Sequence, residues 1–175
     1  MENTTGAGAE NAAAEPSRGP TFALLSQYLK DFSFENPNAP GIFGAVTATP
    51  TLERTLDLTV TPVSGADHEV ALRLKGHATV ASRTLYVVDV VYAGLVRVAG
   101  ASEELTQAAL RVQVAQMLFP FVRQQFLTAV RDGGYPSPAL PPVDFVALYR
   151  RDSARPTAAD AEAPKTLQME VSPDD

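Results

Sequence analysis

The segment TLERTLDLTVTP, residues 51–62, alternates leucine or valine with polar side chains, and this alternation decides the fold. Alternation with a period of two residues is typical of a strand with one apolar face. The segment EVALRLKGHATV, residues 69–80, repeats the pattern, and the turn-forming residues Ser64-Gly65-Ala66-Asp67 lie between the two. The two segments are therefore predicted to form an antiparallel hairpin.

The segment that follows, residues 83–99, is apolar at both sets of alternate positions. One set contains Leu85, Val87 and Val91, and the other contains Tyr86, Val88, Val90 and Tyr92. Helices can cover only one face of such a strand. The second face is therefore predicted to meet another subunit.

Helices are predicted after these strands. Ser102 can cap a long helix whose first turn carries Glu103 and Glu104; Pro120 should kink or restart it, and Gly133-Gly134 should end it. Asp144 can cap a short final helix. Residues 21–34 fit a strand and a helix equally well. Strands followed by helices indicate an α+β fold.

Charge and composition separate a central domain from two arms. Residues 1–20 carry a net charge of −2 and residues 152–175 a net charge of −4, so residues 21–151 are neutral. Both ends are poor in large apolar residues; residues 1–20 contain glycines and prolines, and residues 152–175 contain three prolines. The sequence predicts a disordered N-terminal arm over 1–20, one domain over 21–151 and an acidic disordered tail over 152–175.

The same features exclude several classes of protein. There is no basic stripe for nucleic acid, and Asp89 and Arg97 interrupt the most apolar stretch, so no membrane-spanning helix is expected. The N-terminus lacks the pattern of a secretory signal. The chain has no cysteine, so it has no disulfide, and a reducing cytoplasm suits it.

The sequence contains few residues that are suited to catalysis or metal binding. His68 and His77 are nine residues apart and should point to opposite faces of a regular strand, so they are not expected to share a metal ion. No nucleophile elbow or phosphate-binding loop is present. The close acidic pairs, Glu53 with Asp57 and Glu103 with Glu104, lie where solvent is expected. We expect no catalytic residue, no metal site and no cofactor.

Four blocks of sequence resemble the SecB family of bacterial protein-export chaperones, and together they extend over residues 22–149. The blocks are KDFSFENPNAP (30–40), VAG (98–100), LFPFVR (118–123) and LPPVDFVALY (140–149). The resemblance implies a four-stranded antiparallel sheet of Greek-key type, with a long kinked helix and a short C-terminal helix on one face. It makes residues 22–34 a strand, and it implies a homotetramer built as a dimer of dimers.

The resemblance also implies a function. Members of the family bind unfolded precursor proteins without ATP and deliver them to the motor protein SecA. By position, Asp31, Glu35 and Asp89 match acidic residues that dock SecA, and Val88, Val90 and Tyr92 match oligomer contacts. Leu56, Leu58 and Tyr149 match residues that line the client groove.

Further client-binding candidates come from a surplus of apolar residues in loops and on second faces. They are Ile42, Phe43, Leu140, Phe145 and Leu148. For Phe145 and Leu148, a place in the core is an equally good interpretation. Residues 44–55 hold a short insertion relative to the family, so Leu52 and Leu56 could exchange roles. The alternative function is that of a SecB-like adaptor dedicated to one client, such as an antitoxin.

Overall fold

The hairpin predicted from the two alternating segments is the centre of the sheet. In the computed structural model, β2 (Thr51–Ser64) pairs antiparallel with β3 (Asp67–Val80), and β3 pairs with β4 (Arg83–Ala99). The structure describes residues 20–44, 49–153 and 167–170. The remaining residues of the predicted arm and tail lie outside the described ones.

The N-terminal segment is a strand, as the family resemblance implies. This strand, β1 (Thr21–Glu35), pairs antiparallel with β4 and not with its neighbour in sequence. The strand order is β1-β4-β3-β2-β5, so the predicted four-stranded Greek-key arrangement is confirmed. The structure adds a short fifth strand, β5 (Leu167–Glu170), which pairs with β2 and comes from the segment predicted to be tail.

The long helix begins and ends where its capping residues predict. The Ser102 Oγ accepts a hydrogen bond from the Leu105 N–H at 3.3 Å, and helical structure runs from α1 (Glu103–Ala108) through η1 (Ala109–Val114) and α2 (Ala115–Asp132). Gly134 then adopts a left-handed conformation with φ of 88°. Pro120 lies inside α2 and does not end it; the irregular part of the helix is the π-helical η1, which precedes the proline.

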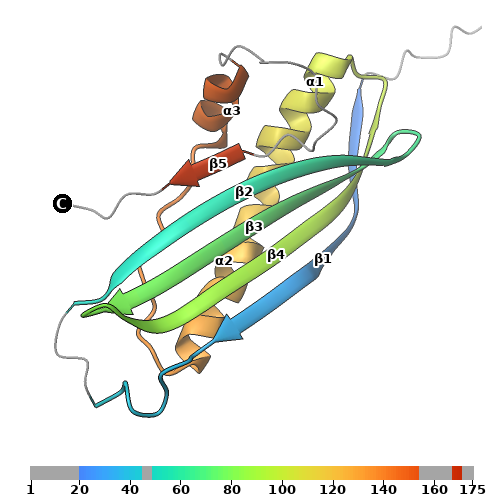
Figure 1. Cartoon of the computed structure of the whole chain (residues 1–175). Coiled ribbons are helices and arrows are strands. Elements are labelled where there is room, and N and C mark those ends of the chain that lie inside the picture. The colour runs from blue at the N-terminus through green and yellow to red at the C-terminus, as the bar shows by residue number, and fades with distance from the viewer. Residues whose placement is uncertain (1–19, 45–48, 154–166, 171–175) are drawn as a thin grey trace, which may run out of the picture.

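All the helices lie on one face of the sheet (Figure 1). The helix α2 packs on β3 and β4, and α3 (Phe145–Ser153) packs beside η1. The core between these layers contains Leu72 and Val90 from the sheet and Leu118, Val122 and Phe126 from α2. No helix among the described residues is long and apolar enough to cross a membrane.

Candidate binding surfaces

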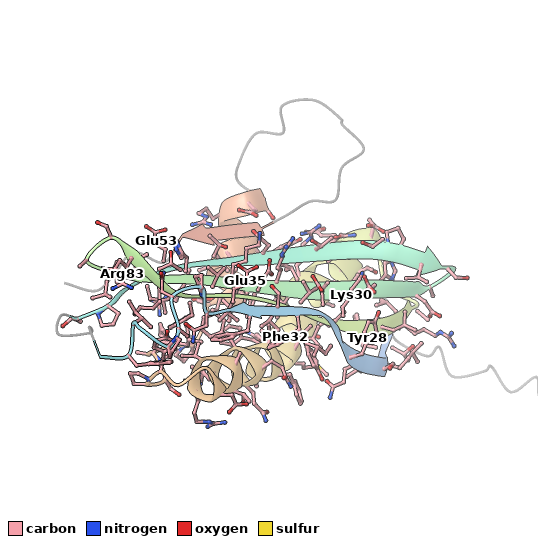
Figure 2. All side chains as sticks on the ribbon, turned by 60° about the horizontal axis from the view of Figure 1, so that its bottom comes forward. Tyr28, Lys30, Phe32, Glu35, Glu53 and Arg83 are labelled. Atoms are coloured by element: carbon pink, nitrogen blue, oxygen red, sulfur yellow. The ribbon has the colours of Figure 1, made fainter. Side chains whose placement is uncertain are left out.

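An apolar surface lies uncovered where β1 extends beyond the helices. Four apolar residues of β1 pair with residues of β4 that are buried on the helix side, so they face that side of the sheet: Phe22, Leu24, Leu29 and Phe32. They are nevertheless exposed: Leu29 to 44% and Phe32 to 42%. Figure 2 shows Phe32 on the helix side of β1, with Glu35 and Lys30 on the other side.

The exposed side chains of α2 continue this surface. The ring of Phe121 stacks on Tyr92, which pairs with Leu29 of β1, and Met117 lies one helical turn before Phe121. We call the six residues Phe22, Leu24, Leu29, Phe32, Met117 and Phe121 the β1 apolar surface. A long edge strand with such a surface is an aggregation hazard unless another molecule covers it.

A second group of residues fixes the loop after β1 to the end of α2. The Tyr135 hydroxyl donates towards the Leu85 carbonyl at 3.0 Å and lies 2.8 Å from Asn36 Oδ1, while Asn38 Nδ2 donates to the Thr84 carbonyl at 2.9 Å. Burial raises the pKa of Tyr135, so its hydroxyl keeps its proton. These contacts give a structural role to two asparagines of the resembling block 30–40, a role that the sequence alone does not predict.

Most of the predicted client-binding residues are buried inside the protomer. Leu56 is 3% exposed and Leu58 is 1% exposed. Buried with them are Ile42, Leu140, Phe145 and Leu148. In this protomer the six side chains therefore do not line an open surface, and their assignment to client binding stays a prediction.

These six side chains are buried because other segments of the same chain pack over them. The alternate side chains Leu56 and Leu58 of β2 face the helices, and α3 turns its apolar side towards η1. The extended segment 135–144 runs back between α2 and α3, and Arg54 Nη1 donates to the Ala139 carbonyl within it. Of the eight predicted client residues, Phe43, which is 47% exposed, and the half-buried Tyr149 remain accessible.

These two accessible residues do not share one surface. Phe43 contacts Tyr135 just beyond the end of α2, with ring centroids 5.4 Å apart. Tyr149 lies on α3, which packs beside η1. At 1.5 Å per residue, the helix separates these two ends by roughly 30 Å.

The predicted oligomer contacts are also buried within the protomer. Val88, Val90 and Tyr92 face α2, and the two valines have no exposed surface. A side chain that is covered inside one protomer cannot contact another, so these three residues are corrected to core. Both sets of alternate residues in β4 are apolar, so the alternation did not show which set the helices cover. The uncovered apolar side chains lie on β1 instead.

The three predicted acidic docking residues do share the outer face of the sheet. Ser33 pairs with Asp89, and Asp31 and Glu35 lie two residues to either side of Ser33 on the same face of β1. Asp31 and Glu35 are exposed. We call Asp31, Glu35 and Asp89 the outer acidic cluster.

Asp89 differs from the other two because its charge is compensated. Arg73 Nε donates to Asp89 Oδ1 at 2.8 Å and Nη2 to Oδ2 at 2.6 Å, with Lys75 Nζ 3.7 Å away. This pairing lowers the pKa of Asp89. The negative field available to a partner therefore comes mainly from Asp31 and Glu35.

The pKa of Asp57, which lies on β2 with β3 between it and β4, shifts in the opposite direction. Its Oδ1 is buried and has no hydrogen-bond partner among the described residues. Burial raises the pKa of Asp57 in spite of nearby Lys75 and Arg73. The described residues hold no group of acidic, histidine or cysteine side chains that could bind a metal ion.

Comparison with known proteins identifies the chain's relatives. The family model described as "Preprotein translocase subunit SecB" matches residues 15–156. The chain belongs to the SecB family. The protein-export protein SecB of Parvibaculum lavamentivorans is 39% identical over 155 residues, which is 88% of this chain and 92% of that protein. SecB of Rhodopseudomonas palustris strain BisB18 is 38% identical over 152 residues, or 87% of this chain and 93% of the relative.

A solved structure supports the SecB fold. The SecB-like chaperone of Mycobacterium tuberculosis, determined in complex with a peptide from the antitoxin HigA1, superposes with a TM-score of 0.57. The match covers 70% of this chain and 90% of that one, with 14% identity. At this identity the likeness concerns the fold alone.

Proposed function

We propose that this SecB-family chain is an ATP-independent export chaperone that works in the cytoplasm. In this role it binds unfolded precursor proteins and keeps them competent for translocation. Membership in the SecB family over residues 15–156 is the observation that carries the proposal. A protein that binds only the unfolded state of a client shifts the client's equilibrium away from folding by mass action, and this needs no nucleotide.

A second candidate is an adaptor dedicated to one client. The fold neighbour from Mycobacterium tuberculosis was solved with an antitoxin peptide, which favours this alternative. That neighbour is 14% identical, whereas the protein-export relatives are 38–39% identical over nearly their whole length. The export function is therefore the better supported of the two.

The β1 apolar surface supports self-association. Its side chains are exposed along a 15-residue edge strand and would be covered if two protomers met there. We assign this surface to the contact between copies in a dimer, and two such dimers would form the homotetramer. This assignment moves the oligomer contact from β4 to β1 and α2.

The outer acidic cluster supports docking of the motor SecA. Asp31 and Glu35 are exposed carboxylates on the face of the sheet that the helices leave open. Such a cluster attracts a basic surface and speeds encounter at low salt. Because the cluster and the β1 apolar surface lie on opposite faces of the sheet, the motor and a second copy could bind at the same time.

Binding to several unrelated unfolded proteins tests the export function. The probes are reduced, carboxymethylated α-lactalbumin and two other permanently unfolded proteins, titrated against the full chain without nucleotide. A general chaperone binds all three, and a dedicated adaptor binds at most one. Binding to none would refute both functions. Tyr149→Ala should weaken binding of all three probes, and Leu105→Ala, at an exposed apolar position on α1, serves as the control.

A further inference from the structure

The outer edge of β2 is partly occupied by the chain's own C-terminal segment. β5 pairs antiparallel with β2, so that Thr55 lies opposite Glu170 and Leu58 opposite Leu167. Figure 1 shows β5 as a short arrow beside β2, next to α3. This contact covers four residues of a strand that is 14 residues long. Within the described residues, the rest of this edge of β2 has no strand partner.

The residues of β2 that pair with β5 include two of the predicted client-binding residues. Leu56 and Leu58, which match groove-lining residues of the family, pair with Met169 and Leu167. Their side chains are buried towards the helices and cannot contact a client. What this part of β2 offers to another chain is its backbone N–H and C=O groups. The chemistry of the site is therefore main-chain hydrogen bonding.

We propose that the edge of β2 accepts extended segments of unfolded clients as an added strand, and that residues 167–170 occupy this edge until a client displaces them. The inference rests on the export-chaperone function and specifies the form in which that function binds its client. Backbone pairing is nearly independent of sequence, which suits a protein that receives many precursors. α3, which carries the accessible Tyr149, packs beside β5 and would adjoin the client strand.

The length of the edge allows a client to displace the tail. A strand of four residues makes few backbone hydrogen bonds, and each adds little net stability, so β5 is held weakly. A client segment that pairs along more of the edge, from Thr51 to Ser64, makes more bonds and replaces it. The tail then lowers the apparent client affinity by the fraction of time during which it occupies the edge.

Two variants of the full chain separate backbone pairing from side-chain effects. Gln168→Pro with Met169→Pro removes two backbone N–H groups and disrupts β5 in either register. Gln168→Ala with Met169→Ala changes the same side chains and keeps the N–H groups, so it is the matched control. Both variants should keep the domain folded, since β5 lies at the edge of the sheet, and thermal unfolding checks this.

The first measurement is the Kd for reduced, carboxymethylated α-lactalbumin. The proline variant is expected to bind on the order of fivefold more tightly than the original chain, as follows if the tail occupies the edge in about four molecules of five. The alanine variant is expected to bind like the original chain. Equal affinities for all three proteins would overturn the inference while leaving the chaperone function intact. If none of the three binds the probe, the chaperone function itself fails.

The second measurement is amide hydrogen exchange in the segment 51–60. Without client, exchange should be faster in the proline variant than in the alanine variant, because the partner strand is lost. Saturation with the unfolded probe should slow exchange again in the proline variant. If the probe binds and this segment stays unprotected, the client lies elsewhere and the strand-acceptor site is refuted.

Discussion

The ring of Phe126 lies directly on Gly76, so that a Cβ built on this glycine would stand 2.7 Å from Phe126 Cε2. Phe126 is fully buried in α2, and Gly76 lies in β3. The missing side chain therefore lets the long helix approach the sheet. This contact fixes the height of α2 above β3.

Gly76→Ala should destabilise the fold, because neither the backbone of β3 nor the enclosed ring of Phe126 can move freely. Overpacking of this kind costs about 1–3 kcal/mol. Gly44→Ala is the control, since nothing lies within 4 Å of a Cβ at that position. Urea unfolding of the two variants measures the difference. Equal midpoints would show that α2 can shift to accommodate the methyl group.

Leu29→Glu should prevent self-association, because it places a charge in the β1 apolar surface. Native mass measurement should then show a smaller assembly than for the original chain. Ser26→Glu adds the same charge to the opposite face of β1 and should leave the mass unchanged. An unchanged mass for Leu29→Glu would move the contact between copies to another surface.

Asp31→Lys with Glu35→Lys should weaken SecA binding by about tenfold at low salt, and the difference should shrink as salt rises. Asp89→Asn should have a smaller effect, because Arg73 already compensates that carboxylate. Glu103→Lys with Glu104→Lys gives the same change of net charge at the start of α1 and controls for it. If both double variants weaken binding equally, net charge and not the outer acidic cluster is responsible.

Replacing Asp89 by asparagine should lower the stability at pH 7, whereas replacing Asp57 by asparagine should raise it. The pKa of Asp89 is held below its ordinary value near 3.8 by Arg73, so its contribution is complete above that pH and is lost as pH falls towards the folded-state pKa. Asp89→Asn should lower the stability at pH 7 by on the order of 1 kcal/mol. The difference from the original chain should narrow below about pH 4.

Burial raises the pKa of Asp57 above 3.8, so its charged form opposes folding at neutral pH. Asp57→Asn should therefore raise the melting temperature at pH 7 slightly. The gain should vanish as the pH falls through the raised pKa, where Asp57 takes up its proton in the folded state. Melting curves between pH 3 and pH 8 measure both variants. A loss of stability for Asp57→Asn at pH 7 would mean that attraction to Lys75 and Arg73 outweighs the burial.

The sequence predicted the hairpin and the long helix because both depend on local rules. Alternation placed β2 and β3 within two or three residues of their observed ends, and Ser102 marked the start of the helix. The position of β1 needed the family resemblance, since residues 21–34 fit two periods equally. The π-helical η1 had no local signal, while Pro120 gave a signal for a break that did not occur there.

The binding residues were harder to predict because exposure depends on which elements lie above a strand. Leu56 and Leu29 are similar in sequence context, yet the first is covered by the helix layer and the second extends beyond it. Alternation shows that a strand has an apolar face and does not show what covers that face. The acidic residues Asp31 and Glu35 were placed correctly on one exposed face because both belong to a single strand.

The strand order has a consequence for how long precursors are held. β1 and β2 lie on either side of the β4–β3 pair, about three strand spacings or 15 Å apart. Two protomers joined along β1 would carry their two β2 edges at the periphery, facing away from each other. One extended polypeptide could then engage both edges, and release from one would be followed by recapture at high effective concentration. Retention would increase with the length of the polypeptide, so that such an assembly would favour long, slowly folding cargo over short peptides.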